Sequence, residues 1–381
     1  MLPSVCSHFF DRSFPRQPVA GGQLPMLDCC RGLAAILVVF FHAATTVSMA
    51  KYFKTDVFHG GVMFCARGVD FFFVLSGFII TYVHWLDLGR SRRVSLYLVK
   101  RFVRVYPILW CVALPLLCLS PLVSPDRMPA QWSERIQLVL GSLALVPTRI
   151  PPVPGVSWTL RHEILFYAVF LIVIWRPRVG AAVLALWFGA CVWHGAGSSS
   201  SNFLSDFLFS PYNVEFMLGV CCGAFVRCRR VRHPLVVSIV GLFCLIAAST
   251  YYQPVANSKQ WIINATSVLQ VAQFGVGSAL VILGLSQLDI SFKISPPKWM
   301  MLIGSASYSI YLIHFPVISL SCKILAAIRS LAPMPPHLAF FIVASLGVLA
   351  GICFHVYAEI PLLRVIRRAV MPKGRENTQA S

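Results

Sequence analysis

The stretch LDCCRGLAAILVVFFH, Leu27 to His42, leads into an apolar run that continues to Ala50. Arg31 and His42 stand eleven positions apart, close to three turns of an α-helix at ~3.6 residues per turn, so both project from one face. Along the helix axis they are separated by about 16 Å, roughly half of the ~30 Å hydrocarbon core of a bilayer. We therefore expect a membrane-spanning helix with a cation at one surface and an imidazole near mid-depth, an arrangement that suits a path leading inward from a charged head group.

The composition is that of a polytopic membrane protein. Of the 381 residues, 57% are hydrophobic and 12% charged, whereas soluble domains have about 45 to 50% and about 25%. The formal net charge of +19 would suggest nucleic-acid binding in a soluble protein. Here the Lys and Arg residues stand between apolar runs, where they determine membrane orientation. The expected partner is a lipid bilayer, and no nucleic acid.

Apolar runs long enough to cross a bilayer predict an all-α bundle of about ten transmembrane helices. The shorter run from Ile136 to Val146 is about half a span and precedes a proline-rich segment, so we expect it to be re-entrant or interfacial. The ten predicted spans lie near residues 32–50, 68–86, 103–120, 157–175, 179–194, 211–226, 234–252, 262–284, 303–320 and 338–357.

The distribution of positive charge predicts that both termini are cytoplasmic. With ten spans and the N-terminus inside, most of the 32 Lys and Arg residues fall in cytoplasmic segments. Residues 1–26 contain no apolar h-region, so we expect no cleaved signal peptide and an uncleaved first span. The predicted organisation is a cytoplasmic tail 1–26, one transmembrane domain 27–360 and a cytoplasmic tail 361–381.

The 13 cysteines do not predict a metal site. Most lie inside apolar runs, where Cys behaves as a small hydrophobic residue. The adjacent pairs Cys29/Cys30 and Cys221/Cys222 cannot face each other on a helix, and no CxxC spacing occurs.

A pair of arginines begins the third predicted span, in RFVRVYP. Arg101 and Arg104 are three positions apart and share a helix face. Basic residues at this place commonly orient a span or contact anionic lipid. Arginine pairs also bind phosphate groups in a fork, and Arg31 is expected at the same membrane surface. The three arginines could therefore converge on one polyphosphate head group.

Two carboxylates are candidates to orient His42. Asp70 opens GVDFFFVLSGFII seven positions before Gly77, a face that would also allow close helix packing. Glu163 lies in SWTLRHEILFY, on one face with Tyr167 and after Trp158. Aromatic residues at a helix end also suit a membrane interface, but an ionisable group at membrane depth is costly and usually functional.

A third motif, GSASYSIYLIHFPV, carries a polar stripe. Ser307, Tyr311 and His314 recur at helical spacing on one face and are candidates for substrate binding. A single histidine in an apolar helix is more often a core residue with a satisfied hydrogen bond, and both interpretations of His314 remain open.

Five segments together resemble a known family. LDCCRGLAAILVVFFH, GVDFFFVLSGFII, RFVRVYP, SWTLRHEILFY and SASYSIYLIHFP occur in this order over most of the chain. They resemble the acyltransferase 3 family of bacterial integral-membrane O-acyltransferases, and look most similar to short members of the succinoglycan type that acetylate exopolysaccharides. Cys29/Cys30 depart from the Gly and apolar residue common there, at positions that carry no chemistry.

The resemblance implies transfer of an acyl group, with acetyl expected, from cytoplasmic acyl-CoA to a hydroxyl of an extracytoplasmic or lipid-linked glycan, in the inner membrane of a bacterium. Acetyl-CoA would be a donor substrate, with no bound cofactor. Arg31, Arg101 and Arg104 match the family's basic motifs, and Trp158 and Glu163 its aromatic and acidic positions. His42 would be a general base or a transient acyl carrier, oriented by Glu163 or Asp70. Candidate acceptor or oxyanion contacts are Trp158, Tyr167, Ser307, Tyr311 and His314.

Two other functions compete with acyl transfer. A transporter or flippase of a lipid-linked glycan or small metabolite would explain His42 and Glu163 as a proton path, but not a basic mouth aligned with Arg31. A scaffold protein would explain neither the ionisable residues His42 and Glu163 nor the basic mouth. The sequence leaves open the acceptor, the acyl chain length and the oligomeric state.

Overall fold

The computed structural model describes residues 24–58, 61–123, 128–197, 202–251, 268–292, 294–329 and 334–370. Within these ranges the chain is built from helices joined by short connections, with no β-strand. Nine helical segments there are long and apolar enough to cross a membrane. They contain α2 (Pro25–Val47), α3 (Gly68–His84), α4 (Val94–Val123), α6 (Trp158–Trp175), α7 (Pro177–Ala196), α9 (Tyr212–Cys228), α11 (Val268–Phe292), α12 (Lys298–Arg329) and α13 (Pro336–Phe354).

The remaining elements do not by themselves meet the length and hydropathy of a membrane span. The α-helices among them are α5 (Trp132–Leu143), α8 (Phe203–Leu208), α10 (Pro234–Tyr251) and α14 (Ile360–Val370). Four 3₁₀ turns, η1 (Met63–Arg67), η2 (Trp85–Asp87), η3 (Ser91–Arg93) and η5 (Gly155–Ser157), precede or follow helices, and a π-helical turn, η6 (His355–Glu359), joins α13 to α14.

The predicted all-α membrane bundle is confirmed. Each of the ten predicted spans has a helix, although the apolar part of α10, Pro234–Ser249, is shorter than the other nine. The predicted half-span is α5, a helix of 12 residues. The predicted tail from residue 361 starts as helix α14, and the beginning of the span expected at 262–284 lies partly outside the described residues.

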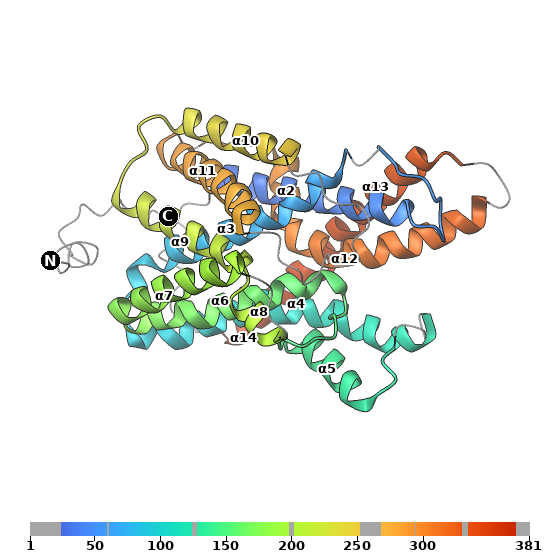
Figure 1. Ribbon diagram of the computed structural model, residues 1–381, viewed down its shortest axis with the longest axis horizontal. Helices are drawn as coiled ribbons and strands as arrows, with labels where there is room; N and C mark the ends of the chain where they lie inside the picture. The colour runs from blue at the N-terminus through green and yellow to red at the C-terminus, as the bar shows by residue number, and fades with distance from the viewer. Residues whose placement is uncertain are drawn as a thin grey trace.

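Two helices, α2 and α3, occupy the centre of the bundle. Figure 1 shows α10 and α11 along one edge, α6 and α7 along the other, and α2 and α3 between them, while α5 projects at the lower right. One apolar cluster joins α2, α12 and α13, a second joins α2, α3, α9 and α11, and a third joins α3, α4, α6 and α9. α2 and α3 thus connect the two sides of the molecule.

The start of α2 is held by two long-range contacts. Pro25 stands at the first helical position, where its missing N–H costs nothing. The carboxylate of Asp289, from the end of α11, accepts hydrogen bonds from the backbone N–H groups of Met26 at 3.0 Å and Leu27 at 3.4 Å. A carboxylate there satisfies donors that the helix itself leaves free and complements its dipole.

α2 and α12 cross at a pair of glycines. A Cβ atom on Gly32 would lie 2.8 Å from the backbone nitrogen of Gly304, and one on Gly304 would overlap the carbonyl of Asp28. Only hydrogen side chains allow two helix backbones to approach this closely. Gly77 plays the same part between α3 and α9, where its Cβ would overlap the carbonyl of Phe216. The predicted close helix approach at Gly77 is thereby confirmed.

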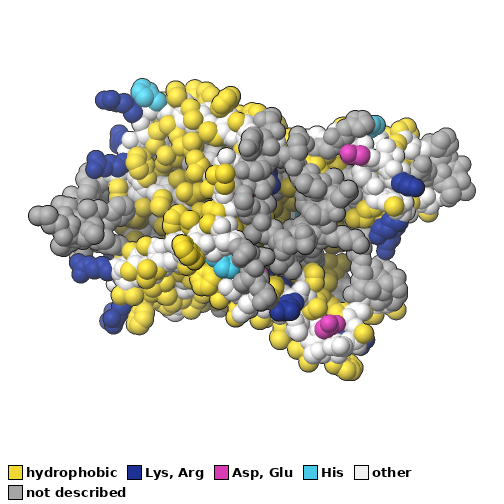
Figure 2. All heavy atoms as spheres, in the orientation of Figure 1, with side chains coloured by type: hydrophobic (Ala, Val, Ile, Leu, Met, Phe, Trp, Pro, Cys, Tyr) yellow, Lys and Arg dark blue, Asp and Glu magenta, His cyan; other side chains and the backbone are white. Residues whose placement is uncertain are grey.

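The charged residues gather at the ends of the helices. Arg229, Arg230 and Arg232 are exposed in the connection from α9 to α10. Val231 there donates a backbone hydrogen bond to the side chain of Gln287, beside the end of α11 that caps α2. Figure 2 shows Lys and Arg side chains at this left-hand end, with hydrophobic side chains across much of the described surface between the two ends.

The glycine crossing gives a first testable prediction. Gly304→Ala places a methyl group against the Asp28 carbonyl and separates α2 from α12, which we expect to cost about 1 to 3 kcal/mol. The measurement is thermal unfolding of the purified protein in detergent. Gly189→Ala in α7 is the matched control, because nothing lies within 4 Å of its Cβ. Equal melting temperatures for Gly304→Ala and wild type would contradict the account of the crossing.

Candidate active site

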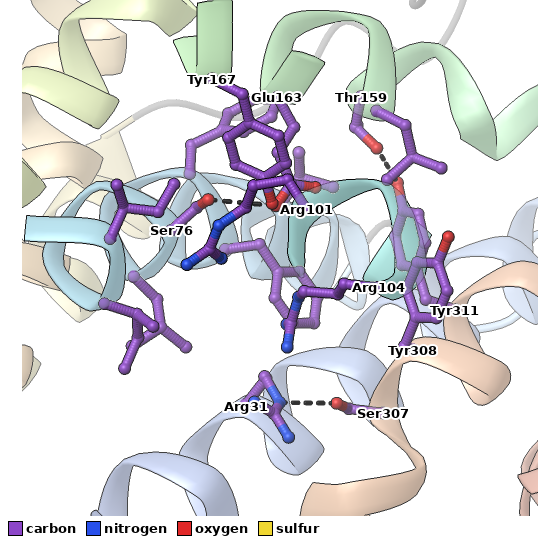
Figure 3. Close-up of a pocket in the computed structure, with 17 residues that line it drawn as sticks. Arg31, Ser76, Arg101, Arg104, Thr159, Glu163, Tyr167, Ser307, Tyr308 and Tyr311 are labelled. Carbon is purple, nitrogen blue, oxygen red and sulfur yellow. Dashed lines mark hydrogen bonds between the residues drawn. The ribbon is translucent and has the colours of Figure 1, made fainter. Parts of the chain in front are cut away.

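A pocket with an empty volume of about 760 Å³ lies between α2, α3, α4, α6 and α12. Figure 3 shows its residues, and the three arginine side chains point into the same space. Seven of the predicted site residues line it: Arg31, Arg101, Arg104, Glu163, Tyr167, Ser307 and Tyr311. The shared helix face predicted for Arg101 and Arg104 is confirmed. Helices far apart in the sequence thus bring together residues that were predicted from helical spacing and from the family motifs.

Arg31 is fixed by the glycine crossing beside it. Its Nε donates to the hydroxyl of Ser307 at 2.8 Å, and one terminal nitrogen donates to the carbonyl of Gly304 at 2.8 Å. The other terminal nitrogen lies 3.2 Å from the carboxylate of Asp28. The hydroxyl oxygen of Ser307, which was predicted as a substrate contact, therefore accepts a hydrogen bond from the guanidinium group.

Arg101 is held by a chain of hydrogen bonds that the sequence did not indicate. It donates to Nε2 of His84 at 2.8 Å, and Nδ1 of His84 lies 2.9 Å from the carboxylate of Asp87. Because an arginine can only donate, Nε2 accepts and Nδ1 carries the proton. The guanidinium also lies over the rings of Tyr97 and Tyr167, at 5.5 and 5.4 Å from their centroids.

Arg104 has no such support. Its side chain is exposed to the pocket and makes no hydrogen bond or ion pair with any residue in the part of the chain that the structure describes. The charged groups lining the pocket are three guanidinium groups and one carboxylate, that of Glu163. Since arginine stays protonated, the pocket carries an excess of positive charge that an anionic ligand would neutralise.

Glu163 is tied to neighbouring hydroxyl groups. Its Oε1 accepts a hydrogen bond from Ser76 at 3.1 Å and another from the hydroxyl of Tyr167. Tyr167, predicted as a substrate contact, thus holds the carboxylate in place. Ser76, Thr159 and Tyr308 also line the pocket and were not predicted; Tyr308 follows Ser307 on α12, and its hydroxyl donates to the carbonyl of Val105 at 2.9 Å.

His42 lies against the second histidine of the motifs. Nε2 of His314 is 3.1 Å from Nδ1 of His42, which is also 3.0 Å from the carbonyl oxygen of Val38. Nδ1 of His314 faces the carbonyl of Ile310 at 3.0 Å and must carry its proton, because a carbonyl only accepts. In the neutral ring its Nε2 then accepts, so Nδ1 of His42 is the donor. The lone pair of His42 therefore resides on Nε2, as a general base requires.

One layer of side chains separates the pocket from this histidine pair. Val69, Phe72 and Tyr311 line the pocket and belong to a cluster that also contains Phe315. The Phe315 ring lies 5.3 Å from that of His42, and the Tyr311 ring lies 5.9 Å from that of His314. The Tyr311 hydroxyl is bonded to Thr159 at 3.0 Å and to the carbonyl of Val156 at 3.1 Å, which holds the layer closed.

The carboxylates expected to orient His42 lie elsewhere. The buried carboxylate of Asp70 is 3.7 Å from Arg67 and stands beside the buried carboxyl of Glu215. Glu163 is occupied by Ser76 and Tyr167, as described above. Neither bonds to His42 within the described residues, and the side chain that does so is His314, beside the backbone carbonyl of Val38. The rotation of each helix about its own axis decides these partners, and the sequence does not specify that rotation.

Trp158 lies apart from the arginine pocket and from the histidine pair. It lines a second pocket, with Arg161, His162 and Tyr212, on the other side of the first turn of α6. No cluster of three or more His, Cys, Asp or Glu side chains suited to a metal ion occurs in the described ranges.

The comparisons with known proteins assign this arrangement to a family. Residues 24–356 match the model of the acyltransferase domain of the acyltransferase 3 type. The chain belongs to the acyltransferase 3 family. It is 29% identical, over 78% of its length and 90% of the relative's, to the exopolysaccharide production protein ExoZ of Rhizobium meliloti. No solved structure matches it.

Other acyltransferase 3 relatives are longer. The chain is 25% identical over 79% of its length to the peptidoglycan O-acetyltransferase OatA of Listeria monocytogenes. It is 22% identical over 77% of its length to the O-acetyltransferase OatA of Staphylococcus aureus. It spans 50% of each of these two relatives. Family membership supports a membrane O-acetyltransferase and disfavours the transporter and scaffold alternatives.

The unpaired charge of Arg104 gives a second prediction. Arg104→Gln should raise the melting temperature of the free protein slightly, because it relieves repulsion among the guanidinium groups, and should weaken stabilisation by added inorganic pyrophosphate. Thermal unfolding with and without pyrophosphate measures both effects. Arg230→Gln, an exposed arginine outside the pocket, is the matched control. The pocket is not an anion site if pyrophosphate stabilises Arg104→Gln and wild type equally.

Proposed function

We propose that the protein transfers an acyl group, with acetyl expected, from acyl-CoA to a hydroxyl group of a glycan, with His42 as the general base or a transient acyl carrier. The observation that carries the proposal is the order of groups along α2. A pocket with three guanidinium groups lies at Arg31, and paired imidazoles lie three helical turns further on, behind a single layer of side chains.

The pocket suits the head group of coenzyme A. That head group carries a diphosphate and a further phosphate, and arginines bind phosphate oxygens through paired N–H donors. Arg31 and Arg101 are already positioned by Ser307 and His84, so little ordering is required of them on binding. The uncharged arm of the donor would pass the Phe72 and Tyr311 layer and bring its thioester to His42.

The chemistry follows from the proton positions of the histidine pair. Nε2 of His42 accepts the proton of the acceptor hydroxyl while the hydroxyl oxygen attacks the thioester carbonyl carbon. The carbon–sulfur bond then breaks, and the leaving thiolate takes the proton from Nε2. In the acyl-carrier variant, Nε2 itself attacks the carbonyl carbon and the carbon–sulfur bond breaks to release the thiolate. The hydroxyl oxygen then takes the acyl group from Nε2, and the hydroxyl proton passes to the thiolate. His314 would hold Nδ1 as an aspartate does in other acyl transfers.

We propose that the arginine pocket opens toward the cytoplasm and that both termini lie there, in a bacterial inner membrane. The exposed arginines between α9 and α10 support this orientation, because they lie beside the end of α11 that caps the start of α2. Positive residues favour the cytoplasmic side. In this orientation the arginine pocket binds acyl-CoA from the cytoplasm, and acetyl transfer takes place deeper in the bundle. ExoZ and OatA bear the names of an exopolysaccharide production protein and of O-acetyltransferases, which favours a glycan acceptor.

Replacing the proposed base gives a third prediction. His42→Ala should leave an inserted protein whose melting temperature still rises with CoA concentration, but whose acetyl transfer falls by at least about 10²-fold. The cellular measurement is mass spectrometry of the O-acetyl content of surface glycans in cells that lack the gene and are complemented with either form.

The outcomes separate the competing functions. Glycans that lose acetyl groups and regain them only with wild type support the proposal. If His42→Ala restores acetylation, the imidazole is not the base. If the glycans keep their acetyl groups but disappear from the surface, the protein moves glycans instead.

The role of His314 gives a fourth prediction. His314→Leu removes the side-chain acceptor of Nδ1 of His42 and leaves only the Val38 carbonyl, so it should lower kcat more than about tenfold, with CoA stabilisation unchanged. His314→Gln offers a side-chain oxygen as acceptor and should recover part of the rate. Steady-state transfer kinetics on the purified variants measure the difference. Equal rates for the Leu and Gln variants would mean that His314 only fills space.

A further inference from the structure

The second pocket is a built cavity outside the donor site. It has an empty volume of about 510 Å³ and lies between the 148–152 segment, the start of α6, α8 and the start of α9. Four aromatic side chains form much of its wall: Trp158, Phe203, Phe207 and Tyr212. The Trp158 and Tyr212 rings lie 5.4 Å apart, and Phe207 lies 4.4 Å from the ring of His162.

The wall is held rigidly by buried polar groups. Arg161 donates to the carbonyl oxygens of Thr148 at 3.0 Å and Ile150 at 3.1 Å, which fixes the 148–152 segment against α6. His162 donates through Nδ1 to the side-chain oxygen of Asn213 at 3.0 Å, and the Asn213 amide donates to the carbonyl of Leu208 at 3.0 Å. α6, α8 and α9 are thereby joined, so the cavity keeps its shape without a ligand.

Two donors in this pocket are not used by the fold. Arg149 is exposed at the rim and makes no hydrogen bond or ion pair with a described residue. The indole N–H of half-buried Trp158 likewise has no partner within the described ranges. A cavity that served only to relieve packing would be apolar or would have its polar groups paired. An aromatic wall with unpaired donors at its edge is instead the composition of a ligand site.

This chemistry suits a sugar ring. A pyranose has flat C–H faces, which pack on aromatic rings, and hydroxyl groups around its edge, which accept hydrogen bonds from N–H donors. Coenzyme A is a poor match, because only one guanidinium group here is free, against the three that line the donor pocket.

The position of the pocket connects it to the proposed base. Trp158 stands between Val156 and Thr159, and both of these are bonded to the hydroxyl of Tyr311. The Tyr311 ring lies 5.9 Å from that of His314, which contacts His42. Along α6, Thr159 and Glu163 face the donor pocket while Trp158 and His162 face this one. The two cavities thus lie on opposite sides of one turn of α6. That turn contacts Tyr311, and Tyr311 contacts the histidine pair.

We propose that this second pocket binds one pyranose ring of the acceptor glycan, stacked on Trp158 and held at its edge by Arg149. The inference rests on the proposed glycan O-acetyltransferase function and adds to it the place of the acceptor. A neighbouring sugar of the same chain would present its hydroxyl to His42. Acceptor choice then depends on α6, α8 and the 148–152 segment, and donor choice on α2, α4 and α12.

The test uses the full-length protein in lipid nanodiscs, with acetyl-CoA as donor. The acceptor probe is oligosaccharide prepared from the chemically de-O-acetylated exopolysaccharide of the producing strain. Trp158→Ala removes the stacking surface, and Arg149→Gln removes the free donor from an exposed position where folding is not at risk. Trp193→Ala on α7 and Arg230→Gln are the matched controls, because both side chains are exposed outside either pocket.

We expect both pocket variants to raise the KM for the oligosaccharide by at least about tenfold, a loss of about 1.4 kcal/mol in binding. CoA should still raise their melting temperatures as it does for wild type, and the control variants should keep the wild-type KM. An unchanged KM in both pocket variants overturns the proposal. So does a fall in kcat with KM unchanged, since that indicates a structural role.

The control measurements keep this inference distinct from the function on which it rests. If CoA fails to stabilise even the wild-type protein, the proposed donor site is wrong. If wild type binds CoA and acetylates the oligosaccharide while Arg149→Gln and Trp158→Ala do so with the same KM, the donor site stands and only the acceptor site is refuted.

Discussion

The contact on which the rest of the site depends is the crossing of α2 and α12 at Gly32 and Gly304. The missing side chains let the two backbones meet, and Arg31 then reaches the carbonyl of Gly304 and the hydroxyl of Ser307. The two helices run in the same direction, since His42 further along α2 meets His314 further along α12. A guanidinium anchor and an imidazole pair are therefore placed by one close contact and the regular rise of two helices.

The arginines inside the bundle have unequal support. Arg161 and Arg227 donate to backbone carbonyl groups and hold segments together. Arg31 and Arg101 are supported by neighbours but still face the pocket, and Arg104 faces it without any partner in the described chain. Folding alone would not favour three like charges around one cavity, because each repels the others through a poorly screened interior. The excess charge would be neutralised by the phosphate groups of the proposed donor.

Much of the fold and part of the site could be predicted from the sequence, because they depend on periodicity. Apolar runs located the spans, and the spacing of Arg101 and Arg104 placed both in one pocket with Arg31. The partner of His42 could not be predicted, since it depends on how α3, α6 and α12 are rotated. His84 as the support of Arg101 was missed because His84 ends another helix, seventeen positions earlier. The second pocket was missed because α8 has only 6 residues and lies in a segment expected to be a loop.

The unbroken course of α2 has a consequence for acyl-group selection. No proline interrupts the helix between Arg31 and His42, so the distance between the guanidinium group and the proposed base is constant. Every acyl-CoA has the same arm between its phosphates and its thioester, and each would therefore deliver its carbonyl carbon to the same depth. Acyl chains differ only beyond that carbonyl carbon. The rings of Phe41 and Phe315 lie 5.0 and 5.3 Å from that of His42. In the proposed reaction these two phenylalanines would limit the size of the transferred group, and substitutions there would change it without altering how the donor is held.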